Sequence, residues 1–339
     1  LLKEKMNFQG LIITDALNMK GSADFASSEE INLQAILAGN DILDFPLHVV
    51  KSISYIKKAL QKGKLTEERL DESVRKILKT KYWAGLHQYK PLPTENLLAE
   101  LHTVEDDLLN RRLVENSITL VQNQKEILPL KNLGQNKMAY VKIGKGEGKT
   151  FFNRINDYSK VDLITGSGAA EISKKLQPYE TVIIGFHTSQ GAYASYKIND
   201  ADLQMIEGIA KNHKVILNIF ASPYSLLKIK SFDDLEGVVV GYQNTALTQD
   251  LAAQMIFGSL DIKGALPVKI NDHFPMGYGL QVSGVNRLGY SVPEDVGMNS
   301  GMLSRIDSIA EEAIDSAKAP GMQVLVARKG KVVYRKSFG

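Results

Sequence analysis

The 339-residue sequence contains no cysteine. The chain can therefore form neither a disulfide nor a thiolate metal site, although this absence selects no cellular compartment. A strong charge of either sign is also missing, because 41 basic and 38 acidic residues leave a net charge of +3. Such a balance does not predict a nucleic acid or an anionic membrane as partner. No apolar run is long enough to span a bilayer, so we expect no membrane span in this chain.

The sequence also lacks an initiator methionine and the charged-then-apolar pattern of a signal peptide at its start. Its first ten residues, LLKEKMNFQG, instead suggest the last turn of a helix that ends at a glycine. We therefore expect a fragment of a longer protein. A length of 339 residues predicts two or three domains.

Residues 1–83 alternate between short apolar segments and helical patterns. A buried strand is predicted at 11–14, and a second one within AGNDILDFP at 38–46. Between them Ser27 predicts the start of a helix, because Glu30 three residues later completes the pattern of a capping box. Two further helices follow. Strands and helices in alternation indicate parallel pairing of the strands.

A second alternating region is predicted at 105–284, after a proline-containing linker at 84–104. Apolar segments that predict strands lie at 138–144, 181–186, 214–220 and 237–242, and helical patterns lie at 105–116, 200–212 and 245–258. This order is typical of a mostly parallel sheet with helices on both faces. The predicted fold class is therefore α/β, with a three-layer αβα sandwich in this region.

The last part of the sequence has a different pattern. A linker is predicted at 285–302, and an apolar stripe at helical spacing begins at Leu303. The final residues predict a β-hairpin whose turn lies at Lys329 and Gly330. One helix and one hairpin bury too little surface for a core of their own. We therefore expect 303–339 to be the truncated start of another domain.

Residues 10–21, GLIITDALNMKG, place an aspartate at the end of the first predicted strand. In parallel α/β folds, active sites lie at the carboxyl ends of the strands. Asp15 is thus a candidate catalytic residue. Aspartate is also common as a cap of the following turn or helix, and spacing alone favours this simpler role for Asp15.

GLIITDALNMKG resembles the nucleophile segment of glycoside hydrolase family 3, and TDAL with a following Met is similar to the β-N-acetylhexosaminidase branch. AGNDILDF and RLDESVRKILKTKYWAGL resemble the following strand and the last helix of the family's barrel domain. ENSITLVQNQKEILPL and GSLDIKGALPVKINDHFPMGYGL resemble the start and end of its αβα domain. The resemblance spans about 5–284. It implies that 1–83 is the C-terminal part of a (β/α)8 barrel.

The resemblance gives several residues a role. Asp15 would be the nucleophile of a retaining glycosidase, forming a covalent glycosyl-enzyme that water then releases. Thr14 and Met19 would line the sugar subsite, and Asp41 would fix barrel loops. The implied substrate is a β-linked N-acetylglucosaminide, such as a cell-wall fragment, and neither a metal nor an organic cofactor is implied. A periplasmic, cell-envelope or secreted location is what the family suggests.

The acid/base group of the hexosaminidase branch is a histidine, paired with an aspartate, on a loop that precedes the nucleophile. All six histidines follow Asp15, and we expect each to lie at the surface or at a helix end: His48, His87, His102, His187, His213 and His273. The chain alone is therefore expected to be inactive or nearly so, since retention needs a proton donor for the leaving oxygen.

Two alternatives remain open. A family 3 β-glucosidase would carry its acid/base glutamate in the αβα domain, where the candidates are Glu147, Glu171, Glu180 and Glu207. The second alternative is a non-catalytic carbohydrate-binding or structural protein with a degenerate barrel. None of the four glutamates lies in a segment that matches the glucosidase branch, so the hexosaminidase is preferred.

Two further patterns favour simple explanations. IGKGEGKT at 143–150 resembles a phosphate loop but lacks the glycine required five residues before Gly148, which predicts a glycine-rich turn instead. The tail from 306 resembles the opening of a serine β-lactamase-like domain, whose Ser-x-x-Lys motif is missing after residue 285. Three chance matches lie elsewhere: Ser54/Lys57, Ser73/Lys76 and Ser225/Lys228.

Overall fold

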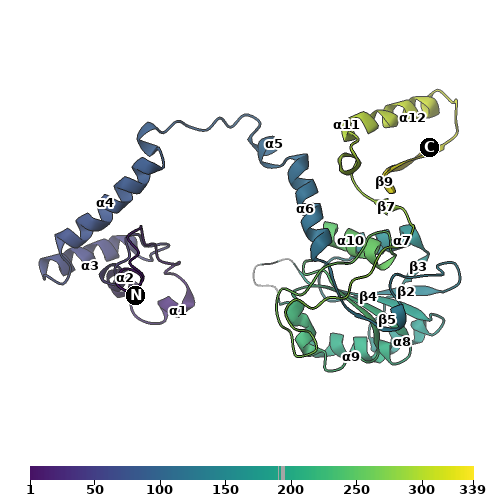
Figure 1. Cartoon of the computed structure of the whole chain (residues 1–339), viewed down its shortest axis with the longest axis horizontal. Coiled ribbons are helices and arrows are strands. Elements are labelled where there is room, and N and C mark those ends of the chain that lie inside the picture. The colour runs from purple at the N-terminus through teal and green to yellow at the C-terminus, as the bar shows by residue number, and fades with distance from the viewer. Residues whose placement is uncertain (190, 192–194) are drawn as a thin grey trace. The chain divides into compact units, whose positions relative to one another are not determined.

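The computed structural model describes residues 1–189, 191 and 195–339 (Figure 1). The chain divides into two compact units, Leu1–Leu97 and Leu98–Gly339. This division differs from the predicted one, because residues 303–339 fall within the second unit. Within the described residues, no helix combines the length and the apolar composition needed to cross a bilayer.

The first unit is mostly helical. Its helices are α1 (Lys20–Ala23), α2 (Ser28–Leu37), α3 (Val49–Gln61) and α4 (Glu67–Trp83), followed by the 3-10 turn η1 (Leu86–Gln88). The Ser27 hydroxyl accepts a hydrogen bond from the Glu30 amide, which confirms the predicted start of α2. Leu33, Ala59 and Leu65 form the small core where α2 and α3 pack together. The segment 84–104, predicted as a linker, contains η1 and α5 (Leu97–Leu101).

The two strands predicted in this unit are reduced to one parallel bridge, which joins Ile13 to Ile42. The Thr14 amide donates to the Ile42 carbonyl at 3.1 Å, and the Ile42 amide donates to the Ile12 carbonyl at 3.1 Å. A buried parallel strand needs neighbours on both edges and covered faces. Ile13 is 54% exposed, so its apolar surface lacks the cover that the sequence pattern predicts.

In the second unit, α6 (Val104–Ser117) follows α5 and leads into a six-stranded sheet. The strands are β1 (Thr119–Asn123), β2 (Met138–Ile143), β3 (Val161–Leu163), β4 (Thr181–His187), β5 (Lys214–Phe220) and β6 (Leu235–Val240). Their order is β1-β6-β5-β4-β2-β3, and only β1 runs antiparallel to its neighbour. All four predicted strands are present. The prediction missed β1 and the three-residue β3, and β3 is too short to give a periodic signal.

Helices cover both faces of this sheet (Figure 1). One face carries α7 (Lys149–Tyr158) and α10 (Ala246–Ile256), and the other carries α8 (Ala169–Leu176) and α9 (Asp200–Ala210). Two 3-10 turns, η2 (Gln124–Glu126) and η3 (Pro223–Lys228), lie between strands. Ile183 packs with α7 and α10, whereas Ile184 packs with α8 and α9. Successive residues of the central strand thus fill two separate cores, as the pleat of a strand requires.

The C-terminal part forms a small sheet with the order β7-β9-β8. Its elements are β7 (Gly289–Tyr290), η4 (Pro293–Val296), α11 (Ser300–Leu303), α12 (Arg305–Asp315), β8 (Met322–Arg328) and β9 (Lys331–Phe338). The predicted hairpin is confirmed, with φ values of 49° at Lys329 and 76° at Gly330. The segment 285–302, predicted as a linker, contains β7, η4 and most of α11.

Tyr290 fixes this C-terminal sheet to the sandwich. Its amide donates to Oε1 of Gln254 at 2.7 Å, and its carbonyl accepts from Gln254 Nε2 at 3.0 Å and from the Arg111 guanidinium at 2.6 Å. The Arg154 guanidinium lies 3.7 Å from the centre of the Tyr290 ring. The partners are distant in sequence, so a local pattern could not reveal this attachment.

Candidate functional site

Asp15 lies two residues after the bridged Ile13, at the carboxyl end of its segment. Its side chain is exposed. One carboxylate oxygen accepts a hydrogen bond from the Ala16 amide at 2.7 Å, and no other partner is found for it among the described residues. The carboxylate thus has one fixed amide contact and an accessible face, which suits a group that attacks an incoming substrate.

Thr14 and Met19 differ in how the structure uses them. The Thr14 hydroxyl accepts a hydrogen bond from the Asp44 amide at 2.9 Å, which ties the two bridged segments together. Met19 precedes α1 and is 53% exposed, so its thioether is accessible. Thr14 therefore has a structural contact in addition to its predicted place in a sugar subsite.

Asp44 is a residue that the sequence analysis did not single out. The parallel bridge between Ile13 and Ile42 places Asp15 and Asp44 at matching positions, each two residues further along. Both side chains are exposed. The signal that could have found Asp44 is the same as for Asp15, a carboxylate that directly follows a short apolar segment.

Asp41 has the contacts of a structural residue, as its predicted role in fixing loops requires. Its side chain is fully buried and accepts from the Ser73 hydroxyl at 2.6 Å and the Ile12 amide at 3.0 Å. Arg69 and Lys76 lie 3.5 and 3.6 Å away. Burial alone would raise the pKa of Asp41, but these hydrogen bonds and the positive charge of Lys76 outweigh it and hold the pKa below its usual value.

The expectation of surface or helix-end histidines is wrong for His187. This residue ends β4 and is completely buried. Its Nε2 lies 2.7 Å from the Tyr140 hydroxyl, its Nδ1 lies 2.7 Å from Oδ1 of Asn244, and its ring stacks on Phe220. Burial lowers the pKa of His187 to about 4, against the opposing hydrogen bond to Asn244. No local pattern predicts this burial, because the partners of His187 lie in other elements.

The glycine-rich turn at 144–148 is held against the end of β4. The Gly146 amide donates to the His187 carbonyl at 2.8 Å, so it is not free to bind a phosphate. A Cβ at Gly144 would meet the His187 carbonyl, and one at Gly146 would meet the Thr188 carbonyl. The glycines are therefore explained by close packing of backbone on backbone, in agreement with the predicted turn.

The four candidate glutamates are spread over the second unit. Glu147 is exposed and lies in the turn after β2, whereas Glu180 precedes β4 at the opposite edge of the sheet and pairs with Lys214 at 2.6 Å. Glu171 pairs with Lys175 in α8, and the hydrogen bond from Lys175 is the main cause that lowers its pKa to about 2. Of the four, only Glu147 lies in a loop at the carboxyl edge.

The three Ser-x-x-Lys pairs use their hydroxyls structurally. Ser54 donates to the Val50 carbonyl within α3, and Ser225 donates to the Tyr196 carbonyl at 2.5 Å. Ser73 donates to Asp41, as described above. Across the part of the chain that the structure describes, no group of three or more acidic, histidine or cysteine side chains is arranged to hold a metal ion.

The chain is similar to known proteins in its fold and, over its first 80 residues, in its sequence. The chain shares its fold with a solved β-glucoside phosphorylase, BglX, at a TM-score of 0.67 and 22% identity; the match covers 79% of this chain and 50% of the other. Residues 1–80 match the model of the glycosyl hydrolase family 3 N terminal domain. The similarity to this family domain is therefore confined to the first 80 residues.

Several curated relatives match parts of the chain. A β-N-acetylglucosaminidase/β-glucosidase of Cellulomonas fimi is 31% identical over 130 residues, which cover 38% of this chain and 23% of the relative. A β-hexosaminidase A of Pseudoalteromonas piscicida is 32% identical over 91 residues, covering 24% and 15%. Several others are named β-glucosidases. The chain spans less than a quarter of the length of the two relatives described.

Proposed function

We propose that this chain is part of a retaining glycosidase in which Asp15 is the nucleophile. The observation that carries the proposal is the exposed carboxylate at the carboxyl end of the bridged segment, within residues that match the family 3 N-terminal domain. The Ala16 amide fixes one oxygen and leaves the other face of the carboxylate accessible. A carboxylate of this kind can form the covalent intermediate of a retaining mechanism.

The chemistry requires two displacements. In the first, an oxygen of Asp15 bonds to the anomeric carbon while the bond to the leaving oxygen breaks and an acid protonates that oxygen. In the second, water attacks the same carbon and releases Asp15. The acid/base group is proposed to lie outside this chain, on the histidine-bearing loop that the resemblance implies. His187 is unsuited to this task, because it is buried behind the glycine-rich turn.

For the substrate we propose a β-linked N-acetylglucosaminide. The support is the TDALNM sequence around Asp15 and the names of two relatives, a β-N-acetylglucosaminidase/β-glucosidase and a β-hexosaminidase. A β-glucosidase is the second candidate, favoured by the names of the other relatives and by the place of Glu147 at the carboxyl edge. A non-catalytic carbohydrate-binding protein is the third.

The parent protein is further proposed to complete its barrel outside this chain and to carry a β-lactamase-like module from residue 303. A periplasmic, cell-envelope or secreted location fits both proposals. The support is the resemblance of each segment, together with the helix and hairpin that residues 305–338 form.

The proposal is tested in a protein that contains the whole N-terminal domain. A 2-deoxy-2-fluoro sugar with a good leaving group should label Asp15, as read by peptide mass spectrometry, and Asp15→Ala should reduce hydrolysis of an aryl N-acetyl-β-glucosaminide by at least ~1,000-fold. Asp44→Ala is the matched control and should leave labelling of Asp15 intact. Label on another carboxylate would contradict the assignment. Faster hydrolysis of the aryl glucoside would favour the second candidate.

A further inference from the structure

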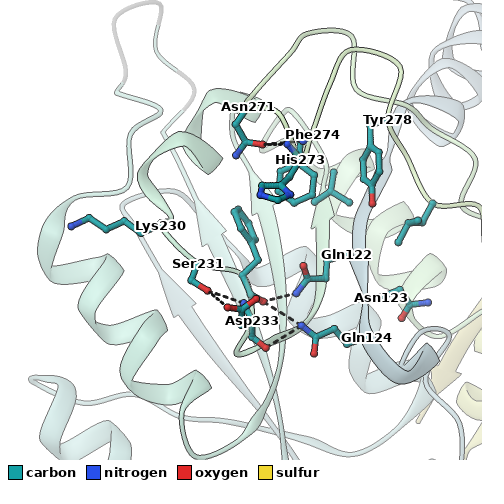
Figure 2. A pocket seen from close by; sticks show the side chains of 13 residues that line it. Gln122, Asn123, Gln124, Lys230, Ser231, Asp233, Asn271, His273, Phe274 and Tyr278 are labelled. Atoms are coloured by element: carbon teal, nitrogen blue, oxygen red, sulfur yellow. Dashed lines mark hydrogen bonds between the residues drawn. The ribbon is translucent and has the colours of Figure 1, made fainter.

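A cavity of about 550 Å³ lies at the end of the sheet where β1 ends and β6 begins (Figure 2). Three separate segments of the second unit line it: 121–124 on β1 and η2, 230–233 before β6, and the loop 271–280. Asp15 belongs to the other unit. The cavity also lies at the opposite end of β6 from the glycine-rich turn, which packs at the carboxyl edge of the sheet. It is thus a feature of the sandwich itself.

The floor of the cavity is held rigidly by two glutamines. Nε2 of Gln122 donates to the carbonyls of Phe232, at 2.5 Å, and of Leu235. Nε2 of Gln124 donates to the Asp233 carbonyl at 3.0 Å. Because the amide nitrogens are bound to backbone, the oxygens must face the other way. Figure 2 shows the Gln122 oxygen on the side of His273 and Tyr278. This acceptor is positioned before any ligand arrives.

One wall of the cavity is aromatic. The rings of Phe232 and Phe274 meet edge to face with their centres 4.9 Å apart, and Phe274 lies 5.5 Å from Tyr278. Phe274 is buried, while Phe232 and Tyr278 are half-buried and keep part of their surface accessible. Oδ1 of Asn271 accepts from the amides of His273 and Phe274, which fixes this loop. The hydrogen bonds of the described residues leave Nδ2 of Asn271 available.

The lining is nearly neutral. Among the described residues that line it, only Lys230 and Asp233 carry a fixed charge. The Lys230 side chain extends away from the cavity in Figure 2, and Asp233 accepts from the Ser231 hydroxyl at 2.8 Å. An anion such as phosphate would find no directed cation, and a cation would find no carboxylate cluster. The ligand class that fits is therefore uncharged.

We propose that this cavity binds a neutral mono- or disaccharide. Sugar hydroxyls both donate and accept, which matches the acceptor of Gln122, the donors of Asn271 and the hydroxyl of Tyr278. The apolar C–H face of a pyranose ring matches the accessible aromatic surface of Phe232 and Tyr278. A volume of about 550 Å³ is within the range of small-molecule sites. The inference stands whether or not Asp15 is a nucleophile.

The test is a titration of the full 339-residue chain with cellobiose and with N,N′-diacetylchitobiose, followed by saturation-transfer NMR and calorimetry. We expect one of these probes to bind. Tyr278→Phe should weaken that binding about fivefold, the equivalent of one hydrogen bond, and Tyr278→Ala, which also removes the ring, should weaken it further. Lys230→Ala is the matched control on the cavity rim and should change the affinity less than twofold. Circular dichroism checks that each variant is folded.

Asp15→Asn separates this site from the proposed nucleophile. Binding that persists in Asp15→Asn and weakens in the Tyr278 variants supports the saccharide site. Three results overturn it: no binding of either probe, binding lost in Asp15→Asn alone, or competition by inorganic phosphate that depends on Lys230. Failure of the glycosidase proposal alone would leave these binding data unchanged.

Discussion

The hydroxyl of Thr14 accepts a hydrogen bond from the backbone amide of Asp44 at 2.9 Å. This contact joins the ends of the two bridged segments, directly beside the two exposed carboxylates. Thr14 thus links the position of Asp15 to the neighbouring segment, and its hydroxyl is as much a part of the local structure as of the proposed site.

Thr14→Val should weaken this link while keeping the shape of the side chain. The lost hydrogen bond should cost about 1 kcal/mol. Hydrogen exchange at the Asp44 amide should accelerate accordingly, as measured by NMR or mass spectrometry. Thr14→Ser keeps the hydroxyl and is the matched control. Unchanged exchange in Thr14→Val would show that the contact is not maintained in solution.

Asp41→Asn should destabilise the first unit at pH 7 by about 3 kcal/mol, because it removes the buried charge that Arg69 and Lys76 face. Asp44→Asn, at an exposed position, should have little effect. Since the pKa of Asp41 is lower in the folded chain, its stabilisation is present above the unfolded value of 3.8 and is lost as pH falls through the folded value.

Chemical denaturation of the two variants as a function of pH checks this prediction. The wild-type unit should lose stability below about pH 4, and Asp41→Asn should flatten that decline. Equal stability of the Asp41 and Asp44 variants at pH 7 would contradict the structural role of Asp41.

His187 should make the second unit sensitive to mild acid. Its folded pKa of about 4 lies below the ordinary 6.5, so the unfolded chain binds the proton first. Stability should be complete above pH 6.5 and fall by about 3 kcal/mol as pH approaches 4. Thermal unfolding followed by circular dichroism across this range measures the slope.

His187→Gln should remove that slope, although it also lowers stability at pH 7 by disturbing the contacts to Tyr140 and Asn244. His213→Gln is the matched control. His213 is only partly buried, and its Nδ1 lies 2.9 Å from the Tyr179 carbonyl. The loss of stability between pH 6.5 and 4 should therefore persist in His213→Gln. An identical pH dependence in His187→Gln would refute the assignment.

Tyr290→Ala should loosen the C-terminal sheet from the sandwich, since it removes the ring beneath Arg154. The loss should be about 1–2 kcal/mol from the cation–π contact and the associated packing. Hydrogen exchange of β7 and β9 should increase while that of β4 and β5 stays constant. Tyr290→Phe keeps the ring and should behave nearly as the wild type. Uniform exchange changes across both sheets would indicate general unfolding instead.

Local patterns predicted much of the second unit. The apolar strands β2, β4, β5 and β6 and the capped helices were identified because their signal lies within each segment. The Lys329-Gly330 sequence likewise predicted the hairpin turn, and both residues have a positive φ in the structure. Glycine and short polar residues carry this information directly in the sequence.

The sequence failed where the structure depends on distant partners. His187 is buried through contacts with Tyr140, Asn244 and Phe220, which are dispersed over about a hundred residues of chain. The segment 11–14 has the composition of a buried strand, but among the described residues it forms a single bridge, to Ile42. Residue type and position indicated Asp15 as a candidate. Its alignment with Asp44 could be seen only in the folded chain.

The glycine-rich turn also limits which mutations the chain can accept. Side chains at 144, 146 and 148 would collide with backbone or with the Tyr140–His187 pair, whereas Lys145 and Glu147 between them are exposed. In a mutational scan, tolerance to substitution should therefore alternate along this turn. Positions 144, 146 and 148 should be intolerant, and positions 145 and 147 should be permissive. Glycines kept at this spacing in related sequences would reflect this packing constraint. Their retention would not be evidence for nucleotide binding.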